Sequence, residues 1–136
     1  MSQANEQAAA LQDILKSSTE SAMEYLSRAI PVLENNLSVL RSDDPSKGMA
    51  VINDSVDGLQ WLMEFAELAG KANETQPVLS MQFADIEDSL AKSVQLIVEA
   101  MTALDHPLLA DVMEFELIAT LHDMQALVTH TLADLH

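Results

Sequence analysis

The sequence predicts an all-α fold, an antiparallel up-down-up-down bundle of four long amphipathic helices. About half of the 136 residues are hydrophobic, whereas only three are glycine and four are proline. The chain therefore has a core to bury and few residues that interrupt helices. Its apolar residues recur at intervals of three and four, the period of one helix face. The β-branched clusters expected of strands are missing. The length fits a single domain, residues 1–136.

The first helix is expected over about residues 5–41. Its apolar stripe consists of residues spaced three or four apart: Leu11, Leu15, Ser18, Ala22, Leu26, Ala29, Leu33, Leu37 and Leu40. Pro31 lies inside this pattern. Since proline lacks an amide hydrogen and crowds the preceding turn, we expect a kink or a break there.

The second helix is expected over about residues 45–69, because Asp44 can cap it and Pro45 suits the first helical position. Gly70 is the expected C-terminal stop. The core stripe is expected to be Met49, Ile52, Val56, Leu59, Met63 and Ala66.

The third helix is expected over about residues 77–104 and the fourth over about residues 106–135, with Asp105 and Pro107 repeating the signal of a cap followed by proline. The third stripe is Leu79, Phe83, Ile86, Leu90, Val94, Ile97, Met101 and Leu104. The fourth is Met113, Leu117, Leu121, Met124, Val128, Thr131 and Leu135. Short connections between long helices favour the antiparallel bundle.

Charge and composition narrow the classes of partner. The chain has 22 acidic and 6 basic residues, a net charge of −16. Such a surface argues against nucleic acid and against anionic membranes as partners, because both attract positive charge. There is no cysteine, which excludes disulfides and thiolate chemistry. The N-terminus lacks the pattern of a signal peptide and no apolar run is long enough to cross a membrane, so a cytoplasmic protein is expected.

Two acidic doublets are the sharpest candidates for chemistry. Glu64 and Glu67 lie one turn apart on the second helix, and Asp85 and Asp88 lie one turn apart on the third. The pattern resembles that of the MazG-type all-α nucleotide pyrophosphohydrolases, which bind magnesium through ExxE on one helix and ExxD on the next. The resemblance implies magnesium-dependent hydrolysis of a nucleotide, although Asp85 stands where that family carries glutamate. Helical geometry places both aspartates opposite the third stripe, towards solvent.

No other group of residues forms a cofactor or metal site, and none is expected. The di-iron pattern of helical bundles needs glutamate three residues before histidine, and no histidine here has one. His130 and Asp134 are four residues apart, so we expect them to form a structural pair on the helix surface.

Four apolar residues fall outside the expected stripes. Trp61, Phe65 and Leu68 share a different face of the second helix from Val56, and Phe115 is off the stripe of the fourth. Either this face is a second contact, with a dimer, a partner's helix or the N-terminal segment, or the second helix is buried on two sides within the monomer.

These observations favour a non-enzymatic helical interaction or adaptor protein. We expect Trp61, Phe65, Leu68 and Phe115 to contact a partner protein, a second copy of the chain, or both. As a small acidic helical bundle without catalytic residues, such a protein is similar in general type to the bacterial export and flagellar chaperones. The alternative is the magnesium-dependent nucleotide pyrophosphohydrolase.

Overall fold

The structure is a computed structural model that describes residues 3–135, and over this range it is all-α. Helix α1 spans Gln3–Leu40, α2 spans Ser46–Ala72 and α3 spans Pro77–Thr102. The last helix is continuous but has three parts: α4 (His106–Val112), a π-helical turn η1 (Met113–Ile118) and α5 (Ala119–Leu135). The predicted all-α fold is confirmed.

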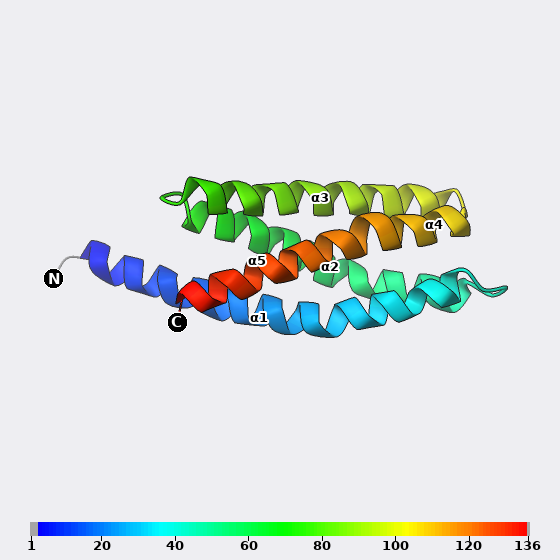
Figure 1. Cartoon of the computed structure of the whole chain (residues 1–136), viewed down its shortest axis with the longest axis horizontal. Coiled ribbons are helices and arrows are strands. Elements are labelled where there is room, and N and C mark those ends of the chain that lie inside the picture. The colour runs from blue at the N-terminus through cyan, green and yellow to red at the C-terminus, as the bar shows by residue number, and fades with distance from the viewer. Residues whose placement is uncertain (1–2, 136) are drawn as a thin grey trace.

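The four helices pack side by side in chain order (Figure 1). Neighbouring helices are antiparallel. Along α1 and α2, Asn36 lies against Gly48, whereas Tyr25, earlier in α1, lies against Gly58, later in α2. In the same way, Arg41 reaches Asp111 while Gln125 reaches Ser27. The backbone of α2 lies close to those of α1 and α3 but, among the described residues, not to that of the last helix. Helices α2 and α5 therefore occupy diagonal corners of the bundle.

The core between the helices is almost entirely aliphatic. Its largest fully buried side chains come from all four helices and include Leu26, Leu33, Ile52, Leu62, Phe83, Leu90, Leu117 and Met124. Burial of this apolar area is the main contribution to the stability of the fold. None of the helices over residues 3–135 combines the length with the apolar character needed to cross a membrane.

Of the two outcomes expected at Pro31, a kink or a break, the break does not occur. Helix α1 passes through Pro31 without interruption, as a gently curved helix (Figure 1). Pro31 itself is exposed, so the lost backbone hydrogen bond lies on the side of the helix where water can satisfy the free carbonyl.

The ends of α2 differ in part from expectation. The Asp44 carboxylate accepts hydrogen bonds from the Ser46 amide at 3.3 Å and the Ser46 hydroxyl at 2.6 Å. The helix begins at Ser46, however, so Pro45 and not Asp44 occupies the capping position, and Pro45 is not the first helical residue. Gly70, however, does not end the helix, which continues to Ala72. Gly70 is buried against α3, where its carbonyl accepts a hydrogen bond from Ser80. The Asn73 side chain closes the helix instead, by donating to the Ala69 carbonyl at 2.7 Å.

Gly58 allows a close approach between α1 and α2. The Tyr25 ring occupies the space that a Cβ atom on residue 58 would need. Burial is the main reason why the pKa of Tyr25 is raised. The glycine lowers the helix propensity of α2 by about 1 kcal/mol relative to alanine, and the packing of the tyrosine offsets this cost.

Candidate protein-interaction surface

An aromatic column runs from the bundle core to the surface of α2. Phe65 is only 3% exposed and meets the Phe83 ring of α3 edge-on, with centroids 6.0 Å apart. Trp61, one turn earlier, stacks on the outer side of Phe65 with centroids 5.9 Å apart and an interplanar angle of 15°. Trp61 keeps 37% of its surface exposed. The column thus supports an aromatic ring at the surface through its contact with a buried one.

The burial of Phe65 corrects two expectations about α2. Phe65 belongs to the monomer core and is not available as a surface anchor, whereas Val56, expected in the core, is 40% exposed. The reason is that α2 packs against both α1 and α3, so its buried face is wide and turned towards the Phe65 side. Of the two interpretations left open by the sequence, the one in which the second helix is buried on two sides within the monomer therefore holds for Phe65.

Trp61 and Leu68 remain at the surface and share one line along α2. Four exposed residues, Asp57, Trp61, Glu64 and Leu68, follow one another at spacings of four, three and four. We call this line the α2 seam, because the spacing is that of the contact line in helix pairs. Its members alternate between carboxylate and apolar side chains.

The neighbouring part of α1 extends the apolar surface. Ser18 of α1 lines a shallow groove together with Trp61, Glu64, Phe65 and Leu68. Ile14 and Leu11 lie four and seven residues before Ser18 on the same face of α1, and both are exposed. Leu11 was expected in the core stripe of the first helix, but it is 47% exposed. Ile14 and Asp57 were not among the residues expected at this surface. Asp57 could have been found from its spacing to Trp61.

Phe115 does not join this surface. It is 68% exposed and lies in the π-helical turn η1. Because the last helix is diagonal to α2 and its backbone does not lie close to that of α2, Phe115 does not form one patch with Trp61 and Leu68. Beside it, Glu114 and Asp111 bind the Arg41 guanidinium at 2.8 and 3.0 Å, which ties the end of α1 to the last helix.

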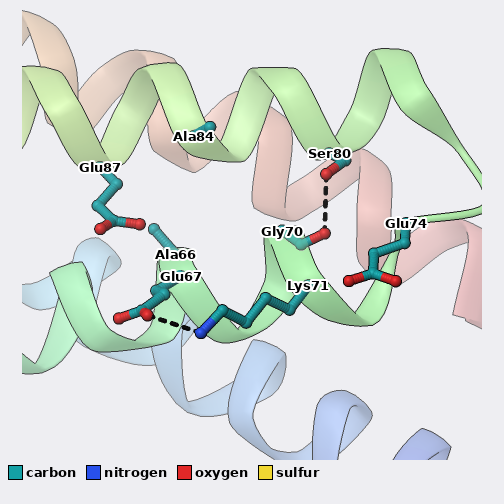
Figure 2. Close-up of a pocket in the computed structure, with 8 residues that line it drawn as sticks. All are labelled: Ala66, Glu67, Gly70, Lys71, Glu74, Ser80, Ala84 and Glu87. Carbon is teal, nitrogen blue, oxygen red and sulfur yellow. Dashed lines mark hydrogen bonds and ion pairs between the residues drawn. The ribbon is translucent and has the colours of Figure 1, made fainter.

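The carboxylates of the hydrolase alternative are separated. Glu67 forms an ion pair of 2.8 Å with Lys71 in a cavity between α2 and α3, where Glu74 and Glu87 also lie (Figure 2). The hydrogen bond from Lys71 lowers the pKa of Glu67. This glutamate is therefore paired with a cation of its own helix.

The other three acidic residues of that alternative face different surfaces. Glu64 lines the groove beside α1, and Asp85 lines a cavity with Asp123 on the side of α5. Asp88 is exposed on α3. Within residues 3–135, no three histidine, aspartate or glutamate side chains are grouped so that they could hold a metal ion. The expected pair of His130 and Asp134 is present, at 3.5 Å.

Comparison with known proteins places the chain in one family. The family model described as "Domain of unknown function (DUF8042)" matches residues 17–127. The chain belongs to this family. The range matched to DUF8042 contains the whole α2 seam and Phe115, whereas Leu11 and Ile14 precede it. Curated proteins and solved structures gave no match.

Proposed function

We propose that this protein is a non-enzymatic, cytoplasmic interaction module that binds a partner protein through the surface formed by α2 and the adjoining part of α1. The observation that carries the proposal is the aromatic column. It leaves Trp61 partly exposed while its ring stacks on the buried Phe65, beside the exposed Leu68. Rigid aromatic side chains lose little entropy on binding and are the residue type enriched at interaction hot spots.

The surroundings of Trp61 support the same proposal. Leu11 and Ile14 of α1 are 47% and 55% exposed, and the fold gives them no role in the core. A run of apolar side chains over two neighbouring helices, bordered by charged residues, is typical of a protein contact. A second copy of the chain is the other occupant that this surface would admit.

The proposal is tested by capture from lysate of the native cells, with quantification of the bound proteins. We expect the double variant Trp61→Ser/Leu68→Ser to remain folded and to lose its partner. The matched control is Met81→Ser/Val98→Ser, which removes two exposed apolar side chains from α3 and should retain the partner. Equal capture by both double variants would contradict the proposal.

A further inference from the structure

We propose that the partner presents a basic amphipathic helix, which lies along the α2 seam with lysine or arginine side chains against Asp57 and Glu64. This inference rests on the proposed function and specifies the chemistry of its partner. It follows from the alternation of the seam, from the lack of cations beside it and from the overall charge.

The alternation of the seam determines what a partner must offer. Trp61 and Leu68 are seven residues apart, as are Asp57 and Glu64, so each pair repeats after two helical turns, about 10 Å. A helix lying along α2 meets both pairs with side chains at the same spacing. Its apolar residues then cover Trp61 and Leu68, and the residues between them meet the two carboxylates.

The carboxylates of the seam are free to accept such a partner. Over residues 3–135, no lysine, arginine or histidine lies within ion-pair distance of Asp57 or Glu64. The nearby Glu67, by contrast, is already paired with Lys71. A partner that covered the seam without supplying cations would desolvate two unpaired carboxylates, which is unfavourable.

The same argument disfavours a second copy of the chain. Two seams paired antiparallel about their midpoint would place Asp57 against Leu68 and Glu64 against Trp61, and would bury four carboxylates without cations. Two chains would also bring together a net charge of −16 each, and they would repel one another at low salt. A basic helix removes both costs.

Trp61, the only tryptophan of the chain, reports directly on this surface. The probe is a helical peptide without tryptophan that carries leucine and lysine alternately along a seam of spacing three and four. We expect it to bind saturably and to shift the Trp61 emission to shorter wavelength, more weakly as salt is added. The same peptide with glutamate for lysine should give no saturable shift.

Variants localise the interaction. Asp57→Asn/Glu64→Gln should weaken peptide binding by about fivefold to tenfold, the effect of losing two exposed ion pairs. The control Asp85→Asn/Asp88→Asn changes the net charge equally but on α3, and it should alter binding less than about twofold. Equal weakening of peptide binding by both variants would overturn the inference, because the peptide would then be attracted by the net charge of the protein and not by the carboxylates of the α2 seam. Binding of the acidic peptide would overturn it too.

The failure of this inference is distinguishable from failure of the proposed function. If Trp61→Ser/Leu68→Ser abolishes partner capture but Asp57→Asn/Glu64→Gln does not reduce it, the surface binds a partner that is not basic. A shift of Trp61 emission with the concentration of the protein alone, accompanied by dimers in analytical ultracentrifugation, would identify a second copy as the occupant and would also overturn the inference.

Discussion

At the residue scale, the contrast between Phe65 and Val56 gives the sharpest test of the fold. Phe65→Ala should lower the free energy of unfolding by about 3–5 kcal/mol, because it leaves a cavity between α2 and α3. Val56→Ala, at an exposed position of the same helix, should change it by less than about 1 kcal/mol. Urea denaturation followed by circular dichroism measures both. Similar losses for the two variants would contradict the burial of Phe65 and the exposure of Val56.

The sequence did not distinguish these two residues, and the reason is geometric. Val56 fits an apolar stripe with Ile52 and Leu59, so periodicity alone places it inside. Whether a helix is buried on one side or two depends on where its neighbours lie, which its own pattern does not record. Phe65 is drawn inwards because α1 and α3 flank its side of α2.

At the element scale, the contact of α1 with α2 depends on Gly58. In an ordinary helix, Gly58→Ala would add about 1 kcal/mol of stability. Here the new methyl group overlaps the Tyr25 ring, so we expect a net loss of about 1–3 kcal/mol from overpacking. In a Tyr25→Ala background the same change should become stabilising. Denaturation of the four proteins of this cycle checks both signs, and additive effects would contradict the contact.

The turn between α3 and α4 is predicted to be under strain at Leu104. This residue has φ of 54° and a side chain that is 68% exposed. The Asp105 amide donates back to the Ala100 carbonyl, the arrangement in which glycine is the usual residue at this position. Leu104→Gly should therefore stabilise the protein by about 1 kcal/mol. The control Met81→Gly, at an exposed position inside α3, should destabilise the protein by about the same amount. Thermal melts would compare the two variants. A loss of stability in both would contradict the strain at Leu104.

The elements themselves were largely predictable from the sequence. The predicted ranges of the four helices agree with the structure to within about three residues at each end, because amphipathic periodicity, proline and capping side chains are local signals. The continuity of α1 through Pro31 was not predictable, since it depends on which side of the proline faces water. Nor did a local signal show that Gly70 packs against Ser80 rather than ending α2.

At the scale of the whole molecule, the arrangement of helices decides which candidate residues can act together. Their positions off the apolar stripes placed Trp61, Leu68 and Phe115 on the surface, yet the diagonal positions of α2 and the last helix separate Phe115 from the other two. Likewise, the spacing within each acidic doublet is regular, but Glu67 and Asp85 face different surfaces. Such relations between elements depend on how the helices are rotated in the bundle, which the patterns of single helices do not contain.

The net charge of −16 also predicts how stability depends on salt. Repulsion among like charges opposes the compact state, and screening relieves it as the Debye length falls from about 30 Å at 0.01 M to about 3 Å at 1 M. The ion pairs weakened by the same screening, such as those of Arg41 and Lys71, are exposed, and exposed ion pairs contribute little to stability. Repulsion should therefore dominate, and Tm should rise by several degrees as sodium chloride is added. The variant Glu20→Lys/Asp54→Lys/Asp88→Lys changes three exposed acidic residues, which takes the net charge from −16 to −10, and should show a smaller rise. A Tm that falls with salt would show that the ion pairs outweigh the repulsion.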